Sequence, residues 1–175
     1  MLVSDKQLIE QLRADNSVSN VLYVANWAMQ NTTNLERIAK VAFSNDQKLA
    51  DRAFWVIEKI VVEQPNFFEP YVDELVRVLV NGQPTDPQLR IGLKILTLVD
   101  YNEEHEGNII CLCTDIMCDT KRPIAVRCNA LELFALISKK YPPLQQELKL
   151  TISQLQHEDL TAGFKARIKK VFRGL

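Results

Sequence analysis

Apolar residues recur along the chain at intervals of three and four, the spacing that places them on one face of an α-helix. The clearest example is 47–63, where Ala53, Val56, Ile57 and Ile60 mark one stripe of a long helix. Nine further segments show the same period, and the chain contains no convincing strand pattern. Helices are therefore predicted over residues 4–15, 21–31, 34–43, 47–63, 67–80, 86–100, 103–118, 123–140, 144–155 and 161–172.

Short polar breaks separate these segments, and short connections make consecutive helices antiparallel neighbours. The dipeptide Asp86-Pro87 is a strong start signal, since Asp caps a helix and Pro fits its first position. The apolar faces are too broad for one helical hairpin to cover alone. The pattern predicts an all-α fold, an α-α superhelix of about five antiparallel helix pairs with about ten helices.

Four arginines stand at corresponding places in this pattern, each after a turn-like stretch and at the start of an apolar run. They are Arg52, Arg90, Arg127 and Arg167, separated by 38, 37 and 40 residues. A recurrence of this length in an all-helical pattern is typical of a solenoid of helical pairs.

The stretch from Phe68 to Val99 resembles a unit of the HEAT-repeat family, whose nearest relatives are the armadillo repeats. It has a first helix over 68–79, an Asp86-Pro87 turn and a second helix with the early Arg90. The resemblance extends over residues ~34–173. It implies a right-handed superhelix whose concave face is lined by the second helix of each pair.

The resemblance also implies a ladder of Asp and Arg side chains between neighbouring units. Asp46 and Arg52 stand six residues apart, in the family's relation, whereas Asp119 and Asp159 precede their arginines by eight. A bidentate Arg–carboxylate pair suits such a structural task. An arginine row that binds a ligand remains the alternative. The predicted ladder residues are Asp46, Arg52, Arg90, Arg127 and Arg167.

The length and composition fit a single array. A chain of 175 residues, 47% hydrophobic and 25% charged, is ordinary for one globular domain that folds without metals or disulfides. We expect one repeat domain over 1–175, with an atypical capping pair at 1–32 and repeats at 33–175.

The charges are unevenly distributed although the chain's net charge is only −1. Residues 1–119 carry 18 acidic and 10 basic side chains, a net of −8, and residues 120–175 carry 4 and 11, a net of +7. In a solenoid the order in sequence is also the order in space, so this division would form a dipole. Head-to-tail self-association is one possible consequence.

Two places in the sequence are candidate partner-binding surfaces. Trp55 follows Arg52 by three residues, on nearly the same helix face, and Trp and Arg dominate interaction hot spots. Packing of Trp55 into a neighbouring repeat is the alternative. The last predicted helix is basic and could bind an acidic partner, or simply face solvent. Its candidate residues are Lys165, Lys169, Lys170 and Arg173.

The sequence offers no recognisable catalytic, metal or cofactor site. Cys111 and Cys113 are too close for a zinc motif, and the four cysteines are expected to be free, buried thiols. His105 and His157 lie among acidic residues at helix ends and have no nucleophilic partner at a recognisable spacing. The chain has neither of the common phosphate-binding glycine loops.

We therefore expect a non-enzymatic interaction module or scaffold that binds a protein partner through a curved helical surface, with no cofactor. One alternative is nucleic-acid binding, as in the HEAT-like DNA repair glycosylases; another is a regulatory subunit of an enzyme complex. The sequence shows no signal peptide and no apolar run long enough to cross a membrane, so a cytoplasmic location is expected.

Overall fold

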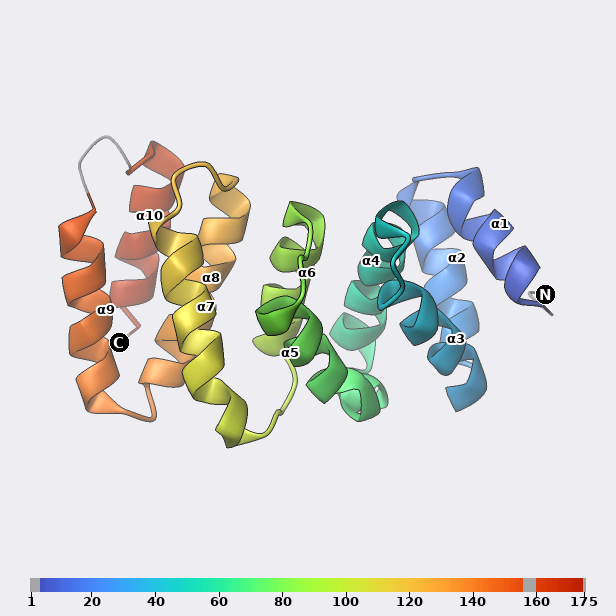
Figure 1. Ribbon diagram of the computed structural model, residues 1–175, viewed down its shortest axis with the longest axis horizontal. Helices are drawn as coiled ribbons and strands as arrows, with labels where there is room; N and C mark the ends of the chain where they lie inside the picture. Colours follow the sequence, from blue (N-terminus) through green and yellow to red (C-terminus); the bar gives the residue numbers. More distant parts are fainter. Residues whose placement is uncertain (1–3, 156–159, 175) are drawn as a thin grey trace. The chain divides into compact units, whose positions relative to one another are not determined.

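The computed structural model describes residues 4–155 and 160–174. These residues form ten α-helices and two short 3-10 helices, and they contain no strand (Figure 1). The α-helices are α1 (Asp5–Ala14), α2 (Val18–Ala28), α3 (Thr32–Ala42), α4 (Gln47–Glu63), α5 (Val72–Asn81), α6 (Asp86–Leu96), α7 (Glu106–Cys118), α8 (Ile124–Ser138), α9 (Pro142–Gln154) and α10 (Ala162–Phe172). The predicted all-α fold is confirmed.

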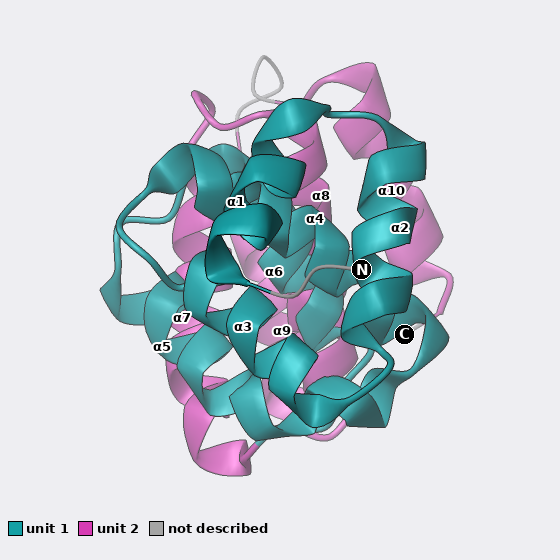
Figure 2. Ribbon diagram, turned by 90° about the vertical axis from the view of Figure 1, so that its right-hand side faces the viewer, with its two compact units in different colours: residues 1–101 teal, residues 102–175 magenta. Residues whose placement is uncertain are grey.

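The chain divides into two compact units, residues 1–101 and residues 102–175 (Figure 2). The first contains the helices α1 to α6, and the second contains α7 to α10. One uninterrupted domain over 1–175, with a capping pair at 1–32, stays a prediction.

Local side-chain hydrogen bonds explain where most helices begin. Ser4 and Thr85 each form a capping box with the glutamine three residues later, and Asp46 accepts a hydrogen bond from the backbone of Leu49. Such caps satisfy backbone N–H groups that the first helical turn leaves without partners. The remaining side-chain caps of α-helices are Ser17, Asn31 and Thr161.

Three helix starts differ by three residues or more from the predicted ones. The helix predicted from residue 103 begins at Glu106, because residues 103–105 form the 3-10 helix η2. The second helix begins at Val18 and not at Val21, because Ser17 caps it and Asn20 is buried, donating to the carbonyl oxygens of Gln11 and Asp15. The segment predicted as helix from residue 67 begins as the 3-10 helix η1 (Pro65–Tyr71), and α5 follows it. Pro70 explains the difference, since it has no N–H to donate to an α-helical hydrogen bond.

In the first unit, α4 lies at the centre and packs against α2, α3 and α6. Its side chains Phe54, Ile57 and Ile60 are almost completely buried. Gly92 of α6 lies so close to α5 that a Cβ atom built there would be 2.7 Å from a terminal methyl group of Leu79. The second helices α2, α4 and α6 therefore form one packed row, as stacked pairs require.

The second unit repeats this arrangement on a smaller scale. The hairpin of α7 and α8 forms its centre, and α8 also packs against α9 and α10. Phe134 of α8 and Phe164 of α10 are fully buried. The apolar contact between second helices thus recurs between α8 and α10.

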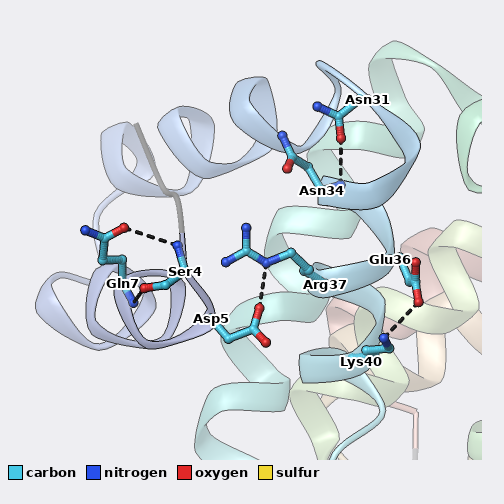
Figure 3. A network of polar contacts seen from close by, with 8 residues as sticks. All are labelled: Ser4, Asp5, Gln7, Asn31, Asn34, Glu36, Arg37 and Lys40. Atoms are coloured by element: carbon cyan, nitrogen blue, oxygen red, sulfur yellow. Dashed lines mark hydrogen bonds and ion pairs between the residues drawn. The ribbon is translucent and has the colours of Figure 1, made fainter.

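Ion pairs between elements far apart in sequence accompany this packing. Asp5 of α1 accepts from Arg37 of α3 at 2.6 Å (Figure 3). The Arg37 guanidinium also lies 5.1 Å from the centroid of the Trp27 ring. The buried Glu58 of α4 accepts from Lys94 of α6 at 2.6 Å. These contacts link successive helix pairs of the first unit by charge as well as by apolar burial.

Candidate binding surface

A cleft of about 420 Å³ opens in the first unit over α4 and α6. Both helices are the second helices of their pairs, so the cleft lies over the part of the row formed by α4 and α6. It contains two of the four recurring arginines, together with the tryptophan singled out from the sequence. Its lining residues are Asn16, Lys48, Asp51, Arg52, Trp55, Pro87, Arg90 and Ile91.

Arg52 is fixed at this cleft by a contact with the first helix of the chain. Its Nη1 atom donates to the carbonyl oxygen of Leu12, which lies in the last turn of α1. Carbonyl groups in the last turn of a helix have no partner within the helix, and a cation there is favourable for the helix dipole. Arg52 therefore closes the end of α1 while its half-buried side chain lines the cleft.

Asp51, the neighbour of Arg52, connects α4 to the start of α6 by hydrogen bonds. Its Oδ1 atom accepts from Oγ1 of Thr85 at 2.5 Å and from Nε2 of Gln88 at 2.9 Å. Both donors belong to the capping box that begins α6. The sequence analysis missed this residue, although its proximity to Arg52 and the glutamine of the capping box were visible in the sequence.

Positive charge exceeds negative charge in the cleft. Lys48 and Arg52 come from successive turns of α4, and Arg90 comes from α6. Lys48 is exposed, whereas both arginines are half-buried. Asp51 is the one acidic residue in the lining, and it is already hydrogen-bonded. The cleft is thus suited to a negatively charged group.

Trp55 supplies an apolar wall one turn beyond Arg52. Its side chain is half-buried and lines the cleft, with Ile91 and Pro87 from α6 as its apolar partners in the lining. The structure brings Trp55, Arg52 and Arg90 together around one space. An aromatic ring beside guanidinium groups is a common composition for a protein-binding hot spot.

Asp46 lies at the start of α4 and outside the lining of this cleft. It accepts from the backbone N–H of Leu49 at 3.2 Å and forms an ion pair with Arg13 of α1 at 3.1 Å. The hydrogen bond from Leu49 lowers the pKa of the Asp46 carboxyl, and Arg13 lowers it further. Arg13, the ion-pair partner of Asp46, and Leu12, the acceptor for Arg52, both lie in α1, so these two predicted ladder residues connect α4 to the preceding pair.

The arginines of the second unit have structural partners. Arg127 is only 2% exposed, its Nε donates to the carbonyl oxygen of Met117 at 2.9 Å, and its guanidinium lies over the Phe164 ring. Arg167 of α10 forms an ion pair with Glu132 of α8. These two recurring arginines therefore lie between helices of the unit.

The basic residues predicted as a partner surface lie on or next to α10. Lys169, Lys170 and Arg173 are exposed, and Lys165 is half-buried. They belong to the second unit and do not line the cleft over α4 and α6. An interaction at this helix stays a prediction.

The cysteines correct one expectation from the sequence. Cys113 and Cys128 are buried, but Cys111 and Cys118 are exposed, because they fall on the outer face of α7. Burial raises the pKa of the Cys113 thiol. Among the residues that the structure describes, no three His, Cys, Asp or Glu side chains are placed to hold a metal ion. His105 is half-buried beside the start of α7, and His157 lies outside the described residues.

In the described part of the chain, no helix combines the length and the apolar character that a membrane crossing needs.

Comparison with known proteins agrees with the arrangement of paired helices. A family model described as the HEAT repeat domain matches residues 8–175. The comparisons found no match among curated proteins and none among solved structures. The match extends over almost the whole chain and includes all four recurring arginines. The chain therefore belongs to the HEAT-repeat family.

Proposed function

We propose that this chain is a non-enzymatic interaction module that binds a protein partner on the face of its first unit where α4 and α6 form the cleft. The observation that carries the proposal is that Arg52, Arg90 and Trp55, from two helix pairs, line one open space. Tryptophan and arginine contribute a disproportionate share of binding energy at protein interfaces.

The architecture supports the same function. Helical repeat arrays expose long surfaces made from corresponding helices, and such surfaces serve mainly as scaffolds for other proteins. The face proposed here is made of second helices, which the HEAT-repeat pattern assigns to the concave side. The Arg52 side chain is already held by its contact with the Leu12 carbonyl, so it would lose little freedom on binding.

The experiment is affinity capture with the full chain from its native source. Mass spectrometry would identify proteins retained by the wild-type chain and lost with Trp55→Ala or Arg90→Ala. Arg77→Ala is the matched control. Arg77 is exposed on α5, the first helix of its pair, and forms an ion pair with Glu74, three residues earlier in the same helix. Each variant is checked for an unchanged melting temperature.

We expect at least one protein to depend on Trp55 and Arg90 and to be retained by the Arg77→Ala variant. A partner retained equally by all variants would show that binding occurs elsewhere and would contradict this assignment. Retention of the partner that depends on Lys169 and Lys170, and not on Trp55 and Arg90, would contradict the assignment and place the interface at α10.

A further inference from the structure

We propose that the cleft over α4 and α6 binds an acidic and apolar peptide segment of the partner, with an Asp or Glu side chain between the basic residues and a neighbouring apolar side chain against Trp55. This inference rests on the proposed function and adds the chemistry of the partner. It is carried by the composition and geometry of the cleft lining.

The charge balance selects a negatively charged group. Three basic side chains line the cleft, namely Lys48, Arg52 and Arg90, against the single carboxylate of Asp51. That carboxylate already accepts hydrogen bonds from Thr85 and Gln88, which hold it against the wall formed by α6. A ligand carboxylate would therefore meet three basic side chains in the lining and one carboxylate that is already hydrogen-bonded. Charge complementarity of this kind favours both specificity and rapid association.

The arrangement of the basic groups fits a single carboxylate. Lys48 and Arg52 are four residues apart and lie on the same face of α4, with Arg90 contributed by α6. The contact of Arg52 with the Leu12 carbonyl restrains its planar guanidinium before any ligand arrives. A guanidinium presents paired N–H donors that match the two oxygens of a carboxylate.

The remaining lining requires an apolar group beside the charge. Trp55 is half-buried and Pro87 is exposed, and the buried Ile91 completes the apolar lining. A ligand that carried charge alone would leave Trp55 and Pro87 in contact with water, whereas an adjacent Leu, Ile or Phe side chain would cover them. Burying such a side chain contributes about 1.5–3 kcal/mol when it is removed fully from water.

The dimensions and surroundings favour a peptide segment over a nucleic acid. A cleft of about 420 Å³ accommodates a few side chains. Residues 1–101 carry 13 acidic and 10 basic side chains, a net of −3, so the positive charge of the cleft is local. Nucleic acid binding depends on many phosphate contacts along a basic surface, and an acidic unit would repel the flanking phosphates.

Selection from a phage-displayed library of random decapeptides on the immobilised full chain tests the proposal. We expect enriched sequences with Asp or Glu next to Leu, Ile or Phe. A synthetic peptide of the enriched sequence should bind at least 10-fold more weakly to Arg90→Gln and Trp55→Ala, with unchanged binding to Arg77→Gln. Its affinity should fall as salt rises from 0.05 to 0.5 M, because exposed charge pairs are screened.

A charge exchange separates ligand contact from a general effect on folding. The variant Arg90→Glu should lose affinity for the acidic peptide and regain part of it for the same peptide with lysine in place of its acidic residue. Enrichment of neutral or basic sequences, no enrichment, or equal binding to all variants would overturn the proposal. Displacement of the peptide by a 20-base-pair DNA duplex at 0.15 M salt would also overturn it, in favour of nucleic-acid binding.

The two proposals can fail separately. Capture of a protein that depends on Trp55 and Arg90 but binds through a segment without acidic residues would leave the proposed function intact and reject its acidic chemistry.

Discussion

Arg127 donates a hydrogen bond from Nε to the carbonyl oxygen of Met117, 2.9 Å away in the last turn of the preceding helix. Arg52 also donates to a carbonyl in the last turn of a first helix, that of Leu12 in α1. The helix α1 belongs to the preceding pair, whereas α7 belongs to the same pair as Arg127. Two of the four recurring arginines thus donate to carbonyl groups that have no partner within their own helix.

Replacing Arg127 by alanine should destabilise the protein strongly. The change leaves the Met117 carbonyl without its donor and opens a cavity beside the Phe164 ring. We expect the free energy of unfolding to fall by about 2–4 kcal/mol, the combined effect of a lost buried hydrogen bond and a cavity. Urea unfolding followed by circular dichroism measures this loss.

Arg173→Ala is the control for that experiment, because Arg173 is exposed just beyond α10. Its effect should stay within about 0.5 kcal/mol, as for most surface substitutions. Equal effects of the two variants would show that Arg127 is not a specific structural contact.

Gly92 should not tolerate a larger side chain, although it lies inside a helix. A Cβ atom there would be 2.7 Å from one terminal carbon atom of Leu79 and 2.8 Å from the other, and Leu79 is itself fully buried. Gly92→Val should therefore lower the free energy of unfolding by about 1–3 kcal/mol through overpacking. Thermal unfolding of the purified variant provides the measurement.

Gly107 offers the matched control, since no atom lies within 4 Å of a Cβ built at that position. Gly107→Ala should be neutral or stabilising by up to about 1 kcal/mol, because alanine favours a helix over glycine. Stabilisation by Gly92→Val would contradict the packing described between α5 and α6, and destabilisation by Gly107→Ala would contradict the open space at that position of α7.

The helical period made the fold predictable, and the errors have local causes. Residues 47–63 were predicted with both ends correct because the cap Asp46 and the breaker Pro65 stand on either side of a regular apolar stripe. Residues 16–19 were predicted as a polar break because three of the four, Asn16, Ser17 and Ser19, are polar. Only the three-dimensional contacts show that Asn20 is buried and hydrogen-bonded to α1 and the loop after it.

The candidate site was only partly predictable. The spacing of Arg52 and Trp55 indicated a shared face, and the recurrence added Arg90 as a corresponding residue. The sequence does not show that these positions from two repeats line one cleft, because this depends on how closely α4 and α6 pack. Nor does it distinguish Arg90, which lines the cleft, from Arg127, which is buried against Phe164.

The cysteines should fall into two classes of reactivity. Cys111 and Cys118 are exposed, whereas Cys113 and Cys128 are buried. Burial raises the pKa of the Cys113, Cys118 and Cys128 thiols, so exposure and not pKa separates the two classes. Because the thiolate is the reactive form, the aromatic disulfide reagent DTNB should titrate two thiols rapidly in the native protein and the others after unfolding. Cys111→Ser should remove one rapid equivalent; rapid reaction of all four would contradict the burial of Cys113 and Cys128.

Asp46 should make the stability of α4 dependent on pH. The backbone N–H of Leu49, and then Arg13, stabilise its ionised form and lower its pKa below the ordinary 3.8. A carboxyl group with a lowered pKa in the folded state contributes stability above pH 3.8, and that contribution disappears as the pH falls through the lower folded value. The difference in unfolding free energy between wild type and Asp46→Ala should therefore be constant from pH 7 to 5 and shrink between pH 4 and 2.

Asp46→Asn separates the charge from the cap, since asparagine also caps helices well but does not titrate. The free energy of unfolding of Asp46→Asn should exceed that of Asp46→Ala by the same amount at every pH. The further stability that the ionised Asp46 gives the wild type should be lost in acid. Urea titrations of the three proteins at pH 7, 5, 3 and 2.5 provide the comparison. The unfolding free energies of wild type and Asp46→Ala could instead differ by the same amount down to pH 2.5. That result would show that the ionised carboxylate of Asp46 stabilises the protein no more than its protonated form does.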